Sequence, residues 1–171
     1  MFNTILGIPA HPLLIHFAVV FIPLLAVGAI VYAAWPPFHK RISWAVLALA
    51  IIAPFAGLFA KLSGQDFKAR LIKEKLTSPA GLVKIAQHNS YGNHTFWWTL
   101  ALGILTLALL AYYWQANKSV TADAGDATAS AASWTAVRIG STVVMLVVGG
   151  IVGWYVFKTG DTGAHIAWQG Y

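Results

Sequence analysis

The chain has 171 residues, of which 58% are hydrophobic and only 9% are charged, and its formal net charge is +6. A soluble domain carries about 25% charged residues, so the composition excludes an ordinary soluble domain and predicts an integral membrane protein. The absence of cysteine excludes disulfides, thiolate-ligated iron–sulfur clusters and covalently attached c-type haem.

Uncharged apolar runs occur four times along the chain. A helix needs roughly 20 residues to cross the hydrocarbon core, and unpaired backbone groups in lipid are so costly that such runs must be helical. Trp and Tyr, which gather at membrane interfaces, lie near the ends of these runs. The expected spans cover about residues 13–35, 42–60, 95–114 and 139–157. The sequence therefore predicts an all-α fold, a membrane four-helix bundle that forms one transmembrane domain over residues 1–171.

The connections between the spans differ in character. The first, WPPFHKRIS, is a tight turn because its two prolines stop a helix. The second, residues 61–94, carries six of the 11 Lys and Arg residues and sets Phe67 and Ile72 among cations, as an amphipathic segment in the membrane interface does. Within it, Ser78 and Pro79 are typical of a helix start. The third, NKSVTADAGDATASAAS, is small and polar, and we expect no chemistry there.

Four spans sort the histidines unevenly between the two membrane faces. Both termini and the second connection lie at one face, and the other two connections lie at the opposite face with His39. The compact turn at residues 39–41 is expected to stay in the cytoplasm by the positive-inside tendency, which places the histidine-rich face outside. That face carries His11, His16, His88, His94 and His165.

His16 is the histidine that most needs an explanation, because it lies within an apolar run. Ionisable residues there usually face a bundle interior or a wet cavity. His11 lies about 140° from it on a helix of about 100° per residue, and Pro12 fits the first helical position, so His11 has a separate role at the helix start. His94 enters the third span at a similar depth, which allows His16 and His94 to face each other. The plain alternative is a histidine that bonds a carbonyl and serves packing.

Imidazole is a ligand for zinc, copper, nickel or haem iron, whereas calcium and magnesium need carboxylates. Asp and Glu total only five in the chain. Among the polar neighbours, Asp161 and Asn93 are candidates for orienting a histidine. A plain turn residue is the alternative interpretation of Asp161.

Small residues predict close helix contacts at two places. In VVGGIVGWYV, Gly149 and Gly153 form a G-x-x-x-G pattern with Gly150 beside them, and Gly57 provides a smaller version on the second span. Such faces pack inside the bundle, join two protomers in a homo-oligomer, or leave room for a flat ligand. Packing inside one bundle is the favoured interpretation.

The residues HPLLIHF, the histidine before the third span and GGIVGWYVFKTGDTGAHIAW resemble the bacterial membrane family catalogued as domain of unknown function 2231. The resemblance covers nearly the whole chain. The family shows His-Pro and then His-Phe-Pro on its first helix; His11-Pro12 and His16-Phe17 match, while Ala18 replaces the last proline. The resemblance implies a location in the bacterial cytoplasmic (inner) membrane, and the redox domains found beside relatives imply an association with electron transfer.

Two functional hypotheses follow. The first is a b-type haem or metal-binding component of an electron-transfer chain, with His16 and His94 as ligands, His88 as their substitute, and His11 and His165 as further candidates. The second is a non-catalytic accessory or assembly subunit, whose histidine face and basic connection dock a larger membrane complex or anionic lipid.

Other classes of function have less support. A transporter or proton relay is disfavoured because the spans contain no Asp or Glu, and the sequence has no hydrolase or phosphate-binding motif, so an enzyme is not expected. The positive charge is concentrated beside the membrane and fits lipid headgroups rather than nucleic acid.

Overall fold

The computed structural model describes residues 4–5, 8–120 and 127–168, and the side chains of residues 10–116 and 134–168. Long helices make up almost all of it, as the sequence predicts. Two strands of two residues each, paired antiparallel, precede the first helix and were not expected. The elements are β1 (Thr4–Ile5), β2 (Ile8–Pro9), α1 (Ala10–Ala34), the short 3-10 helix η1 (Pro36–Phe38), α2 (His39–Lys73), α3 (Pro79–Val120) and α4 (Ala127–Trp168).

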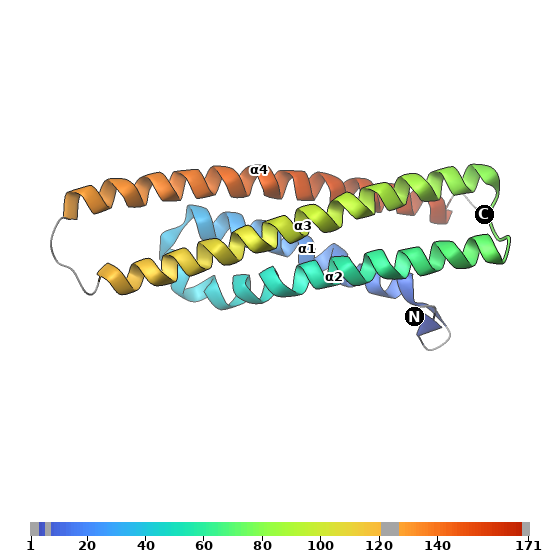
Figure 1. Ribbon diagram of the computed structural model, residues 1–171, viewed down its shortest axis with the longest axis horizontal. Helices are drawn as coiled ribbons and strands as arrows, with labels where there is room; N and C mark the ends of the chain where they lie inside the picture. Colours follow the sequence, from blue (N-terminus) through green and yellow to red (C-terminus); the bar gives the residue numbers. More distant parts are fainter. Residues whose placement is uncertain (1–3, 6–7, 121–126, 169–171) are drawn as a thin grey trace.

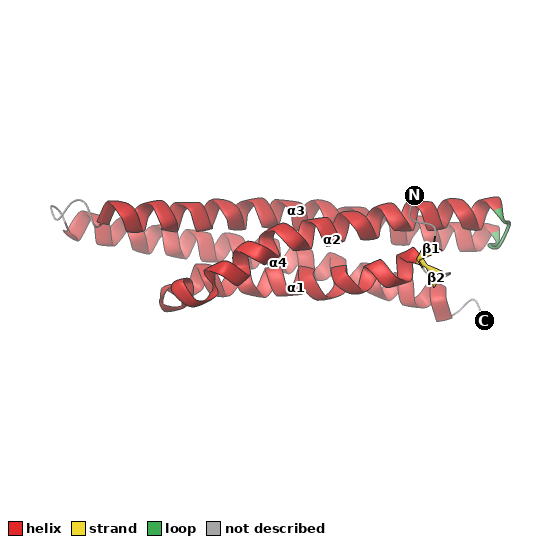
Figure 2. Ribbon diagram, turned by 90° about the horizontal axis from the view of Figure 1, so that it is seen from below, coloured by secondary structure: helices red, strands yellow, loops and turns green. Residues whose placement is uncertain are grey.

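The four long helices lie side by side along one axis (Figure 1). α1 packs against α2 and α4, and α3 packs against the same two helices, so α1 and α3 are diagonal to each other. The β1–β2 pair, the end of α4 and the α2–α3 connection lie at one end of the bundle, with η1 at the other (Figures 1 and 2). The predicted up-and-down topology is confirmed. We call the first of these ends the terminal end.

The amphipathic segment expected between the second and third spans is formed by the ends of two long helices. α2 runs on without a break to Lys73 and α3 begins at Pro79, so the two helices extend past α1 at the terminal end (Figure 1). Lys75, at φ 53°, turns the chain between them. The predicted helix start is confirmed, because Ser78 Oγ accepts a hydrogen bond of 3.1 Å from the Gly81 N–H.

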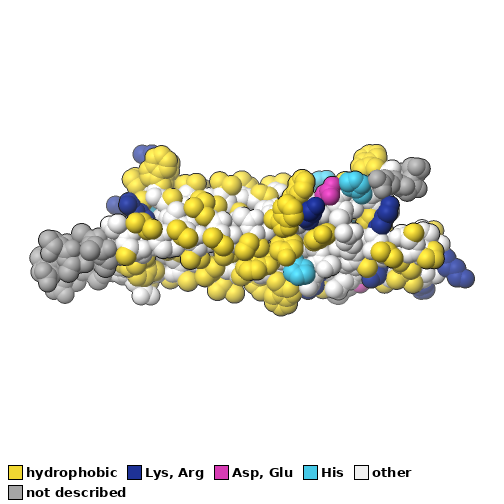
Figure 3. Space-filling view, turned by 90° about the horizontal axis from the view of Figure 1, so that it is seen from above, with side chains coloured by type: hydrophobic (Ala, Val, Ile, Leu, Met, Phe, Trp, Pro, Cys, Tyr) yellow, Lys and Arg dark blue, Asp and Glu magenta, His cyan; other side chains and the backbone are white. Residues whose placement is uncertain are grey.

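The outer surface fits a lipid environment. Each of the four long helices contains a stretch apolar and long enough to cross a membrane. Lys and Arg side chains lie on both sides of a middle region that is covered by apolar side chains (Figure 3). The protein is therefore a multi-pass membrane protein.

Small residues bring the helices together in the core, at positions that the sequence identified only in part. A Cβ at Gly103 of α3 would lie 2.9 Å from the backbone oxygen of Ala50, so α3 passes close to α2 at this glycine. A Cβ at Gly149 would lie 3.1 Å from Ile30 Cδ1 of α1, and one at Gly57 would make ordinary contacts. Gly150 and Gly153 have open space instead: no atom lies within 4 Å of either Cβ position. The G-x-x-x-G residues thus face different surroundings.

Candidate functional site

The structure brings together two histidines that are 77 residues apart in sequence, His11 at the start of α1 and His88 on α3. Their ring centroids lie 6.3 Å apart, with the ring planes at 79°. Ser63 of α2 and Thr162 of α4 bind the two imidazoles. All four long helices therefore contribute to one polar cluster at the terminal end. We call His11, Ser63, His88 and Thr162 the paired-histidine site.

The hydrogen bonds around His11 favour one tautomer. The Ser63 hydroxyl lies 3.0 Å from the Ala60 carbonyl oxygen and 3.0 Å from His11 Nδ1. With its single proton donated to the carbonyl, its oxygen accepts from His11 Nδ1. Ser63 is fully buried, at 0% exposure, which leaves water no access to this hydroxyl. Neutral His11 therefore carries its proton on Nδ1 and has a lone pair on Nε2.

His88 has the same arrangement on the opposite side of the cluster. The Thr162 hydroxyl donates to the Lys158 carbonyl over 2.8 Å and accepts from His88 Nδ1 over 3.2 Å. The lone pair of neutral His88 therefore also lies on Nε2. In both histidines the hydrogen bond at Nδ1 orients the ring. The nitrogen that does not bind the metal has the same role in protein metal sites.

Two glycines make room for these rings. A Cβ at Gly64 would lie 3.0 Å from His11 Cε1, and a Cβ at Gly163 would lie 3.0 Å from His88 Cε1. Each glycine directly follows the hydroxyl residue of the site, giving Ser-Gly on α2 and Thr-Gly on α4. The sequence reasoning missed all four residues, although this repeated pair of hydroxyl and glycine was a signal for them. Phe67 stacks on the His11 ring at a centroid distance of 6.1 Å.

His16 and His94 are not brought together, and the expectation that they face each other across the bundle is wrong. Both side chains are exposed, and they belong to the diagonal helices α1 and α3. His16 Nδ1 donates to the Pro12 carbonyl at 2.6 Å, and His94 Nδ1 donates to the Ser90 carbonyl at 2.8 Å. His94 also stacks on the Tyr155 ring at 5.0 Å.

The difference follows from helix periodicity. The buried stripe of α1 contains Ala18, Ile22 and Leu25, and His11 lies on this stripe seven residues before Ala18. His16 is rotated away from it. The helix face on which His16 lies, and not its place within the apolar run, determines that its side chain is exposed on the lipid-facing side.

The remaining candidates lie outside the paired-histidine site. His165 Nδ1 lies 2.8 Å from the Asp161 carbonyl oxygen and 3.3 Å from its Oδ1, so Asp161 orients a histidine, on the exposed side of α4. Asn93 is half-buried on α3. Within residues whose side chains are described, no group of three or more His, Asp or Glu is placed to hold a metal ion.

His39 lies at the opposite end, as predicted, in a different environment. Its Nε2 donates to the Tyr32 carbonyl over 2.6 Å. Its ring lies 4.2 Å from the Tyr32 ring and 4.4 Å from the Tyr113 ring. The Tyr113 hydroxyl is buried and has no hydrogen-bond partner among the described residues. We call these three residues the aromatic cluster.

Comparison with known proteins identifies one family. The model of the family described as "Predicted membrane protein (DUF2231)" matches residues 7–170. No curated protein and no solved structure matches the chain.

Proposed function

The chain belongs to the DUF2231 family of predicted membrane proteins, and we propose that it binds one transition metal ion between His11 and His88 as an electron-transfer component of a bacterial cytoplasmic membrane. One observation carries the proposal. Two imidazoles lie side by side, and a hydroxyl that is itself bonded to a helix carbonyl meets each Nδ1. This arrangement favours the neutral tautomer with its lone pair on Nε2, the form in which histidine binds metals.

Two imidazole nitrogens as ligands favour some metal ions over others. Imidazole nitrogens suit copper, zinc, iron and nickel, and copper has the highest affinity among these divalent ions for a given nitrogen site. Electron transfer, which the family resemblance implies, needs an ion that changes oxidation state. Copper is therefore the first candidate, with zinc as the redox-inactive comparison.

Haem fits the site less well than a single ion. Gly64 and Gly163 pack directly against the two imidazoles, and Phe67 covers one face of His11. Neither the cavity of about 580 Å³ nor the one of about 290 Å³ between α3 and α4 includes His11 or His88 in its lining. The close packing around the rings supports a bare ion and leaves little room for a porphyrin.

The test is metal binding by the purified full chain. Cu(I) is titrated anaerobically in competition with a chelator, and the loaded protein is then oxidised and examined by electron paramagnetic resonance. We expect one ion per chain and at least a tenfold loss of affinity in His11→Ala and in His88→Ala, with His16→Ala and His94→Ala close to the wild type. Equal binding by all four variants, or no bound ion, would refute the site. Zinc binding without a reversible copper couple would refute the electron-transfer role alone.

The accessory-subunit hypothesis is a second candidate, supported by the part of the α2–α3 hairpin that extends beyond α1 (Figure 1). Lys73 and Lys75 are exposed there, within reach of an acidic partner or headgroup. It predicts that Lys73→Gln with Lys75→Gln abolishes co-purification of a partner complex while His11→Ala does not. The reverse pattern would count against it.

A further inference from the structure

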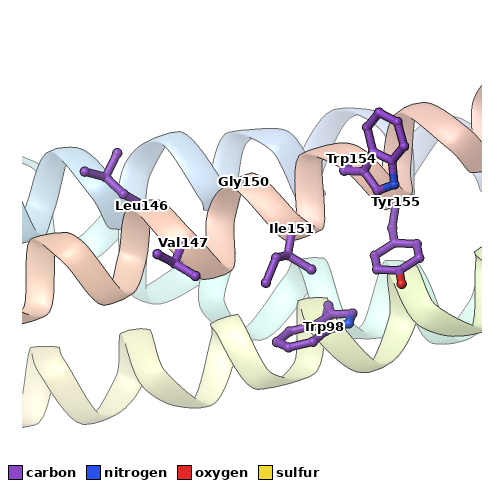
Figure 4. A pocket seen from close by; sticks show the side chains of 7 residues that line it. All are labelled: Trp98, Leu146, Val147, Gly150, Ile151, Trp154 and Tyr155. Atoms are coloured by element: carbon purple, nitrogen blue, oxygen red, sulfur yellow. The ribbon is translucent and has the colours of Figure 1, made fainter.

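An apolar groove runs along the lipid-facing side of the α3–α4 pair. It has a volume of about 580 Å³, and its lining includes Trp98 of α3 and Gly150, Ile151, Trp154 and Tyr155 of α4 (Figure 4). No atom lies within 4 Å of a Cβ placed on Gly150. The missing side chain at Gly150 therefore leaves the floor of the groove open.

A second cavity of about 290 Å³ lies between the same two helices, nearer the terminal end. Its lining is more polar than that of the first cavity. Its lining includes Lys84, Gln87, Tyr91, Lys158 and His165. The lysine, glutamine and tyrosine side chains carry N–H or O–H groups, whereas the Nδ1 proton of His165 is donated to Asp161.

The two cavities follow one another along the same side of the α3–α4 pair. On α4, Gly150, Trp154, Lys158 and His165 follow one another at spacings of four, four and seven residues, which places them on one helix face. Tyr91, which lines the second cavity, and Tyr155, which lines the first, have ring centroids 6.5 Å apart. We call the two adjacent cavities together the groove.

The position of Lys158 sets the depth of this groove in the membrane. Lys158 is the first charged residue after the uncharged run that ends at Phe157, and its Nζ lies 5.0 Å from the ring centroid of Trp154. A lysine above an interfacial Trp is typical of the boundary between acyl chains and headgroups. The polar cavity thus lies at headgroup level and the apolar groove at acyl-chain level.

We propose that this groove binds one anionic phospholipid, with its phosphate between Lys84 and Lys158 and an acyl chain over Gly150. The charges favour an anion: two lysines line the head pocket, while its carboxylate, Asp161, pairs with His165 at 3.3 Å. Basic pockets between membrane helices recognise anionic headgroups in this way. The proposal is independent of metal binding.

The headgroup part is tested by titrating the detergent-purified full chain with short-chain phosphatidylglycerol and phosphatidylcholine, followed by native mass spectrometry. Both lipids carry a phosphate, but only phosphatidylglycerol has a net negative charge. We expect phosphatidylglycerol to bind at least tenfold more tightly. Lys84→Gln with Lys158→Gln should remove that preference, whereas the control Lys40→Gln with Arg41→Gln, which removes the same charge at exposed positions of the opposite end of the bundle, should keep it. Equal binding of both lipids by the wild type would overturn the proposal.

The acyl-chain part is tested by Gly150→Leu, which fills the groove. We expect it to weaken both lipids about tenfold, while Gly140→Leu, at another exposed glycine with open space, leaves them unchanged. Unchanged lipid binding in Gly150→Leu would overturn the proposal.

Two further outcomes would assign the groove to another occupant. Binding of glycerol phosphate as tight as that of phosphatidylglycerol would make it a site for a free phosphate ester. A lipid-free dimer that Gly150→Leu dissociates would make it a contact between copies of the chain. Either result would overturn the lipid proposal.

Discussion

The two ends of the bundle each hold imidazoles, and they use them differently. In the aromatic cluster, the His39 ring stacks on Tyr32 at 4.2 Å and lies tilted against Tyr113 at 4.4 Å, so the ring acts chiefly as packing surface. In the paired-histidine site, hydroxyls hold the Nδ1 atoms of His11 and His88, and glycines lie against the rings. Neighbouring hydroxyls and glycines, rather than burial alone, distinguish a histidine prepared for a ligand from one used for packing.

Replacing an imidazole by a benzene ring should separate these two roles most strongly. Phenylalanine keeps a planar aromatic ring and removes both nitrogens. At position 88 (His88→Phe) we expect a loss of metal affinity of about a hundredfold, because the Nε2 lone pair disappears. His39→Phe should leave metal affinity unchanged and lower the unfolding free energy by about 1 kcal/mol, the typical contribution of the lost hydrogen bond to the Tyr32 carbonyl, since the ring contacts survive. Copper titration and thermal unfolding measure the two effects, and equal losses of affinity would erase the distinction.

The hydroxyls provide a second and weaker test. Ser63→Ala and Thr162→Val remove the acceptors that fix the tautomers of His11 and His88, and loss of such a partner typically lowers metal affinity about 10–100-fold. We expect the lower end of that range, because the ligand nitrogens themselves remain.

The matched control is Ser141→Ala at the other end of the bundle. The Ser141 hydroxyl likewise donates to a carbonyl of its own helix, that of Arg138, but holds no histidine. If Ser63→Ala and Ser141→Ala bind copper equally well, the hydroxyl does not orient His11. Thermal unfolding of the variants shows whether any loss of affinity reflects a disturbed fold.

The membrane spans could be predicted because run length and charge determine them. The continuation of α2 beyond Ala60 could not. The stretch around Phe67 has the alternation of apolar and basic residues of an interfacial helix, and the same pattern suits a helix that packs against a neighbour. Phe67 stacks on His11 of α1. This contact between distant parts of the chain favours the packed helix over the interfacial helix, and no local sequence pattern reveals such a contact.

The sequence could have predicted that His88 lies inside the bundle, but not that it meets His11. His88 lies on the stripe that continues through Thr95, Thr99 and Leu102, all buried, so helix periodicity alone places it inside the bundle. Ranking histidines by their depth in the apolar runs instead favoured His16 and His94. The meeting of His88 with His11 depends on the stagger of α1 against the longer α3, which is a property of tertiary packing.

The smallest effect is expected from a single methyl group beside the proposed metal site. Gly163→Ala places a Cβ 3.0 Å from His88 Cε1, so the ring must shift by a few tenths of an ångström and its Nε2 moves with it. We expect metal affinity to fall about threefold, although alanine favours the helix by up to about 1 kcal/mol. Gly160→Ala gives the same helix gain with no atom within 4 Å of the new Cβ, so it should raise thermal stability and leave affinity unchanged. If both variants keep the wild-type affinity, the glycine beside His88 serves helix packing only, as the rings around His39 do.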